Sequence, residues 1–153
     1  MKIYIGADHG GFELKENLKL YIQNLGLEVV DLGALTLNPE DDYPDFIFPV
    51  SQNVAQEEGS LGIVIGRSGN GEAIAANKVK GIRAAVCTNI EMAKKAREHN
   101  DTNVLSLGAD YVSDDEAKEI VKVFLETDFS REERHKRRIE KISEYESANT
   151  RHT

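Results

Sequence analysis

The sequence predicts an α/β fold in which a five-stranded parallel sheet lies between two layers of helices. Short apolar runs alternate along the chain with longer segments whose apolar residues recur at helical spacing. The run SLGIVIG is apolar almost throughout, which is typical of a strand covered on both faces. Glycine-rich turns follow the first and third runs, where a parallel sheet requires the chain to pass from strand to helix.

The individual elements follow from the same patterns. Strands are predicted at residues 2–7, 27–33, 60–66, 82–88 and 103–108. Helices are predicted at residues 12–25, 45–58, 89–98, 113–125 and about 131–145, with a further one starting in the loop GRSGNGE. Gly26 is a C-cap signal, and Ser113 followed by Glu116 is a capping-box pattern. The tail 146–153 is polar and expected to be frayed. Without a linker or internal repeat, residues 1–153 are predicted to form one domain, a Rossmann-like three-layer α/β/α sandwich.

Composition excludes several classes of function. The net charge of −8 argues against general nucleic-acid binding. No apolar stretch approaches the roughly 18 residues that a membrane helix needs, and the start MKIYIGAD lacks the apolar run of a signal peptide. The single cysteine, Cys87, suits a reducing compartment. We therefore expect a soluble cytoplasmic protein with no nucleic-acid or membrane partner.

The loop Gly66–Glu72, GRSGNGE, is the most informative segment. Ligands of such folds lie outside the carboxyl ends of the strands, and this loop follows the third strand. Its three glycines let the backbone approach a ligand closely, and the free N–H groups of the following helix suit a phosphate or an enediolate oxygen. The loop is neither a GK[ST] phosphate loop nor a G-x-G-x-x-G fingerprint. From the residues alone, an anion site and a simple tight turn remain equally open.

Other polar residues lie where chemistry could occur. Glu72 could be a general base, although a charge complementing the helix dipole is the simpler interpretation. The remaining candidates end the first strand (Asp8, His9), end the fourth helix (His99, Asn100) or share one face of the basic segment REERHKRR (Arg134, Arg138). That segment would suit a small anionic ligand, or it could be a solvated helix face with internal ion pairs. The histidines and Cys87 show no metal-ligand spacing, so no metal site is predicted.

Taken together, the segments resemble the ribose-5-phosphate isomerase type B family, which also includes galactose-6-phosphate isomerase subunits. Five motifs carry the resemblance in order over residues 1–145: GADHGGFELK, DYPDF, GRSGNGEAIAANKVKGIRAA, AREHND and RHKRRI. One branch of the family uses a cysteine base at the start of the central loop, where this chain has Arg67 and no cysteine. The other branch has SGNGE and uses its glutamate, which is Glu72 here.

The resemblance implies a role for each matching residue. Glu72 would move the proton between C2 and C1, Ser68 would shuttle a proton between O1 and O2, and Asp8 with His99 would open the sugar ring. The implied substrate-binding residues are the amides of Gly69, Asn70 and Gly71, the phosphate ligands His9, Arg134 and Arg138, and the contact positions Tyr43 and Asn100. The resemblance implies no metal and no organic cofactor. It also implies a homodimer, or a dimer of dimers, with each active site shared between two subunits.

One position departs from the family pattern. Many relatives have a phosphate-binding arginine at the second position after LSLG, where this chain has Asp110. We hypothesise that Arg67, counted as a further substrate-binding residue, partly restores the positive charge. The resemblance thus implies interconversion of ribose 5-phosphate and ribulose 5-phosphate. Two alternatives stay open: isomerisation of a six-carbon sugar phosphate, such as allose or galactose 6-phosphate, and a non-catalytic phosphate- or nucleotide-binding module.

Overall fold

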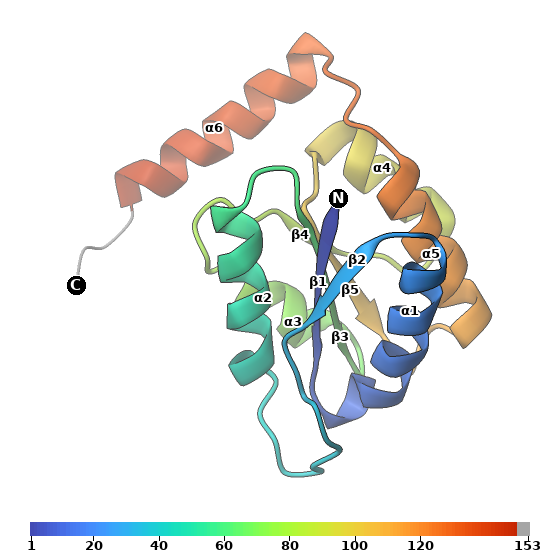
Figure 1. Ribbon diagram of the computed structural model, residues 1–153. Coiled ribbons are helices and arrows are strands. Elements are labelled where there is room, and N and C mark those ends of the chain that lie inside the picture. Colours follow the sequence, from blue (N-terminus) through green and yellow to red (C-terminus); the bar gives the residue numbers. More distant parts are fainter. Residues whose placement is uncertain (150–153) are drawn as a thin grey trace.

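The computed structural model describes residues 1–149 and contains one parallel sheet with helices on both faces (Figure 1). The five strands are β1 (Lys2–Ala7), β2 (Glu28–Asp31), β3 (Leu61–Gly66), β4 (Ala84–Val86) and β5 (Val104–Gly108). They are ordered β2-β1-β3-β5-β4, and every neighbouring pair is parallel. The predicted fold class is therefore confirmed. Among the described residues, no helix has the length and apolar character needed to cross a bilayer.

The helices also follow the predicted pattern. They are a short 3₁₀ turn η1 (His9–Gly11) and the α-helices α1 (Phe12–Asn24), α2 (Pro44–Gln56), α3 (Asn70–Ala76), α4 (Ile90–Asn100), α5 (Asp114–Glu126) and α6 (Glu133–Asn149). The predicted capping box at the start of α5 is present, with Ser113 and Glu116 each bonded to the other's backbone N–H. Gly26 follows α1 with a positive φ of 85°, as a C-terminal glycine should.

The predicted frayed tail is wrong for its first four residues, because α6 continues to Asn149. The Asn149 side chain donates a hydrogen bond to the Tyr145 carbonyl at 2.9 Å, within the last turn of the helix. The rest of the predicted tail, residues 150–153, lies outside the described residues.

Two apolar cores cover the two faces of the sheet. Ile3 and Ile5 of β1 face a core with α1, α4 and α5, whereas Tyr4 between them faces a second core with α2 and α3. This alternation is the two-residue period of a strand. All six residues of β3 are buried, as the apolar run predicted. The two cores hold the carboxyl ends of β1, β3 and β5 at one common edge.

A buried ion pair ties α1 to β2. Lys15 has no exposed surface, and its Nζ lies 2.7 Å from Asp31 Oδ2 and 3.0 Å from Glu16 Oε1. Burial alone would raise the pKa of Asp31, but Lys15 and Lys19 hold it below its usual value. Such a pair is costly to break, because the remaining charge stays buried without its partner.

Helix α6 extends away from the body of the molecule (Figure 1). Its first turn packs on the end of α4, where the His135 and His99 rings stack with centroids 4.4 Å apart. Farther along α6, Ile142 and Tyr145 are 58% and 72% exposed. The helix therefore presents apolar side chains that residues 1–149 leave uncovered.

Candidate active site

The loop after β3 is fixed in a tight conformation at the carboxyl edge of the sheet. Gly69 has a φ of 84°, which side chains rarely tolerate, and its carbonyl accepts a hydrogen bond from the buried Ser106 Oγ at 2.7 Å. Ser68 Oγ accepts one from the Asn70 N–H at 3.1 Å, so the turn leads directly into α3. The loop is also bound to the end of β5, since the Ala109 N–H donates to the Gly66 carbonyl at 2.8 Å.

Glu72 turns its side chain inward at this edge and is only 4% exposed. Its carboxylate lies against the Cα of Gly66, so closely that a Cβ added at Gly66 would overlap it. Burial raises the pKa of Glu72, and the nearby Asp8 carboxylate raises it further, while the N–H groups of Glu72 itself and Gly69 act in the opposite direction. A buried carboxylate with a raised pKa suits a general base better than it suits a helix cap.

Asp8 reaches the same edge from the end of β1. Its Oδ1 accepts a hydrogen bond from the Gly10 N–H at 2.9 Å, which fixes the turn into η1. Gly11 then packs against the end of β3, where an added Cβ would lie 2.6 Å from the Ile65 carbonyl oxygen. This close approach brings the turn after β1 beside the turn after β3, and with it Asp8 beside Glu72.

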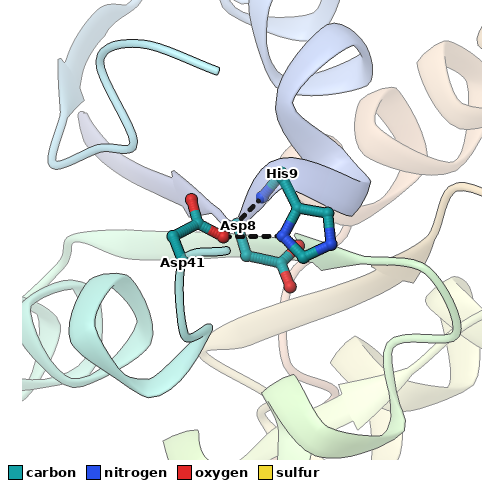
Figure 2. A group of neighbouring side chains, drawn as sticks. All are labelled: Asp8, His9 and Asp41. Atoms are coloured by element: carbon teal, nitrogen blue, oxygen red, sulfur yellow. Dashed lines mark hydrogen bonds and ion pairs between the residues drawn. The ribbon is translucent and has the colours of Figure 1, made fainter. Parts of the chain in front are cut away.

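His9 is bound to Asp41, which lies in the long segment between β2 and α2 (Figure 2). Asp41 Oδ1 accepts from the backbone N–H of His9 at 3.0 Å and lies 2.7 Å from the ring Nδ1. Asp8, His9 and Asp41 together offer three ligand atoms within 4.8 Å of one another, the arrangement in the described residues that could hold a metal ion. His9 Nδ1 and Asp41 Oδ1 are, however, joined to each other as donor and acceptor.

Tyr43 and Arg67 lie at the border of this edge. The Tyr43 ring rests on Gly71, where an added Cβ would lie 2.7 Å from its Cζ. The Arg67 stem lies over Gly10, and its guanidinium Nη1 is 3.9 Å from Asp110 Oδ1, with both side chains more than half exposed. Arg67 helps to line a cavity of about 290 Å³, whose other residues are His9, Gly10, Glu13, Leu37 and Pro39.

The remaining predicted site residues lie at the opposite edge of the sheet. His99 and Asn100 end α4 where the chain turns into the start of β5, and the Asn100 carbonyl accepts from Arg83, just before β4. Arg134 and Arg138 are on α6, beyond this amino edge (Figure 1). Within one chain, these four residues therefore do not join Glu72.

A larger cavity, of about 560 Å³, also lies at the amino edge, but it does not have the features of an active site. Its lining includes charged residues that bind one another or the backbone. Arg97, for example, donates to the Thr102 carbonyl at 2.6 Å and to Asp101 Oδ1 at 3.0 Å. We place the candidate site at the carboxyl edge, where the buried Glu72 has a raised pKa and lies beside Asp8.

Three residues that the sequence analysis did not identify support the candidates. Ser106 holds the Gly69 carbonyl, Asp41 holds His9, and His135 stacks on His99. Burial lowers the pKa of His135, and the neighbouring His99 and Arg134 lower it further. The sequence does show the two aspartates before Tyr43 and the histidine within RHKRR, but neither pattern indicates which residue the side chain contacts.

A family model described as ribose/galactose isomerase matches residues 3–142. The chain belongs to this family. A ribose-5-phosphate isomerase B of Mycobacterium tuberculosis is 44% identical over 146 residues, which cover 95% of this chain and 90% of the relative. The resemblance inferred from the five motifs is thereby confirmed.

Solved structures of the ribose/galactose isomerase family superpose closely on the chain. The ribose-5-phosphate isomerase B of Clostridium thermocellum has a TM-score of 0.94 and 47% identity, covering 98% of this chain and all of its own. That of Mycoplasma genitalium, solved with bound ribulose 5-phosphate, has a TM-score of 0.93 and 41% identity, covering 97% of each chain.

Proposed function

We propose that this chain is an isomerase that interconverts ribose 5-phosphate and ribulose 5-phosphate. The observation that carries the proposal is the Glu72 carboxylate, buried at the carboxyl edge of the sheet next to Asp8 and the loop that follows β3. Family membership and the ribulose 5-phosphate bound to the Mycoplasma genitalium relative support the choice of substrate.

In the proposed reaction, Glu72 removes the proton from C2 of the open-chain aldose. The electrons of the C2–H bond form the C1=C2 double bond, and those of the carbonyl move onto O1. The N–H groups of Gly69, Asn70 and Gly71 stabilise the resulting enediolate, for which the Asn70 N–H exchanges its bond to Ser68 Oγ. Ser68 passes the O2 proton to O1, and Glu72 returns its proton to C1 as the C2 carbonyl forms.

The environment of Glu72 suits this role. Burial raises its pKa, so the ionised carboxylate is a stronger base than an exposed glutamate. Burial disfavours the ionised carboxylate, and only the ionised form can accept a proton. Activity therefore requires a pH above the raised pKa. A well-placed base of this kind contributes about 10²–10⁴-fold to the rate.

We further propose that the working unit is at least a homodimer whose site is shared between subunits. His99 and Asn100 precede β5, whereas Glu72 lies beside Gly66, which pairs with the last residue of β5. The four residue steps from Val104 to Gly108 span about 13 Å at about 3.3 Å each. A proton-transfer partner must lie within about 3 Å of its target. The ring-opening pair of Asp8 and His99, and the phosphate ligands Arg134 and Arg138, therefore require a second copy of the chain.

The alternative of a six-carbon substrate is raised by Asp110, which occupies the position of a phosphate-binding arginine in many relatives. Its carboxylate faces Arg67 across the border of the site and would repel a phosphate placed there. Because an exposed ion pair is worth only about 0–1 kcal/mol, Arg67 can leave Asp110 to bind substrate at little cost. An Arg67→Ala variant with an unchanged Michaelis constant for ribose 5-phosphate would exclude this role of Arg67.

The test is to measure formation of ribulose 5-phosphate by purified protein, with allose 6-phosphate and galactose 6-phosphate as competing substrates. We expect ribose 5-phosphate to have the highest kcat/KM. Glu72→Gln should lower kcat by at least about 100-fold while ribose 5-phosphate still binds. Glu119→Gln, an exposed glutamate on α5, is the matched control and should behave as wild type. Near-normal turnover of Glu72→Gln would overturn the proposal.

A further inference from the structure

Asp41 and His9 form a closed carboxylate–imidazole unit. One oxygen of Asp41, Oδ1, accepts both the backbone N–H and the ring Nδ1–H of His9, at 3.0 and 2.7 Å (Figure 2). The Asp41 side chain is only 8% exposed, and within residues 1–149 its other oxygen, Oδ2, is buried without a hydrogen-bond partner. His9 therefore supplies every hydrogen bond that the Asp41 carboxylate receives in the described part of the chain.

This arrangement fixes the histidine ring in two respects. The ring cannot rotate without losing the bond from Nδ1, and the acceptor at Nδ1 requires that nitrogen to carry a proton. The ring's other nitrogen, Nε2, points away from Asp41 and has no partner among the described residues. At 25% exposure, the His9 side chain is partly open to the cavity that it lines with Arg67.

A metal ion is the competing interpretation of the same residues. A cation bound through His9 Nδ1 and Asp41 Oδ1 would have to break the hydrogen bond that joins these two atoms. In the structure these two atoms are hydrogen-bonded at 2.7 Å, and Asp8 Oδ1 already accepts from the Gly10 N–H. The residues are thus arranged as a hydrogen-bonded pair, with Nε2 as the free functional atom.

We propose that Asp41 is a positioning residue: it holds the His9 ring so that, with a proton on both ring nitrogens, Nε2–H donates to a phosphate oxygen of the sugar phosphate. The proposal rests on the proposed function, which gives His9 a role in phosphate binding. Asp41 lies on the same segment as Leu37 and Pro39, which line the cavity opposite Arg67. The hydrogen bond from His9 to Asp41 therefore also holds that segment against the end of β1. The same contact thus orients the His9 ring and positions the residues that line the cavity beside it.

The test is a double-mutant cycle of Asp41→Ala and His9→Ala, read out on ribose 5-phosphate turnover and on binding of inorganic phosphate by calorimetry. Loss of a hydrogen bond to a charged group predicts that Asp41→Ala raises KM and the phosphate Kd by about ten-fold. kcat should change by less than about three-fold, because the reacting carbons lie elsewhere. In the His9→Ala background, Asp41→Ala should have no further effect on either constant.

Several outcomes would overturn the proposal. Independent, multiplicative effects of the two substitutions would show that Asp41 does not act through His9. An unchanged phosphate Kd would do the same, as would activity that is lost in EDTA and restored by a divalent cation, since the trio would then be a metal site. Asp42→Ala, the exposed neighbour, is the control and should resemble wild type in both assays.

Two measurements keep the test informative. Asp41→Asn retains an acceptor of the same shape, so it should fold even where alanine does not and should show a smaller rise in the phosphate Kd. Nitrogen NMR of the His9 ring should show a proton fixed on Nδ1 in the wild type and a mixture of tautomers in Asp41→Ala; a mixture in the wild type would refute the positioning role. Phosphate binding does not require turnover. A protein that binds phosphate through His9 and Asp41 but does not isomerise ribose 5-phosphate would therefore contradict the proposed function and not the role of Asp41.

Discussion

Complementation between two inactive variants tests whether the site is shared between subunits. Glu72→Gln removes the proposed base at the carboxyl edge, and His99→Asn removes the proposed ring-opening partner at the amino edge. Each variant alone should have little activity, because every site in its homodimer carries the same defect. If one site draws Glu72 from one subunit and His99 from the other, a mixed dimer contains one doubly defective site and one intact site.

The expected recovery follows from this arrangement. Random exchange of an equal mixture gives half mixed dimers, and half of the sites in those are intact, so activity should reach about a quarter of the wild-type value. If both residues acted within one chain, no site in the mixture would be intact. The sheet separation of about 13 Å between the two edges already argues against that case.

The assay is co-expression of the two variants with different affinity tags, purification on both, and measurement of ribulose 5-phosphate formation. A mixed dimer isolated in this way should have about half of the wild-type activity, since one of its two sites is intact. The control pairs Glu72→Gln with Glu119→Gln. Its mixed dimer should also have about half of the wild-type activity, because one of its two sites has both Glu72 and His99. A doubly tagged dimer as inactive as its parents would refute a site shared between these two residues.

Four further outcomes are expected. Gly66→Ala should lower kcat by about 100-fold with little change in KM, because the new Cβ must displace the Glu72 carboxylate; steady-state kinetics would show it, and a normal kcat would contradict the packing. Because burial raises the pKa of Glu72, the acid-side fall of kcat/KM should occur at a pH above the usual glutamate pKa of about 4.3. For the same reason, Glu72→Gln should be more thermally stable than wild type at pH 7, where ionising the buried carboxylate opposes folding. Asp31→Asn should lower the free energy of unfolding by about 3 kcal/mol in urea titrations, because Lys15 then stays buried without its closest partner; a change within error would mean that Glu16 suffices.

The elements that local patterns specify were predictable from the sequence. The apolar run of β3 and the Ser113–Glu116 capping box depend on residues close together in the chain, and both are confirmed. The tail was misjudged because polar composition says little about a helix whose turns bond internally, as Asn149 does. Composition cannot show where an element continues when nothing interrupts it.

The site was predictable in its residue types but not in its supporting contacts. Asp41 and His9 are 32 positions apart, and no periodicity connects them. The stacking of His135 on His99 depends on how α6 leaves the body of the molecule, which follows from tertiary packing alone. The close contact of Gly66 with Glu72 likewise appears only when the loop closes on itself.

The distribution of charge explains why the predicted site residues occupy two edges. Asp8, Asp41 and Glu72 gather at the carboxyl edge of a chain whose net charge is −8, and Arg67, at the border of this edge, faces Asp110 at 3.9 Å. A doubly charged phosphate would enter that edge of an isolated chain against its carboxylates. The positive charge of Arg134 and Arg138 is instead on α6.

Helix α6 also carries Ile142 and Tyr145, which the described part of the chain leaves exposed. If a second chain buries that apolar face, the two arginines arrive at its carboxylate edge in the same step. Association would then be driven by apolar burial along the helix and would deliver the charge that phosphate binding needs.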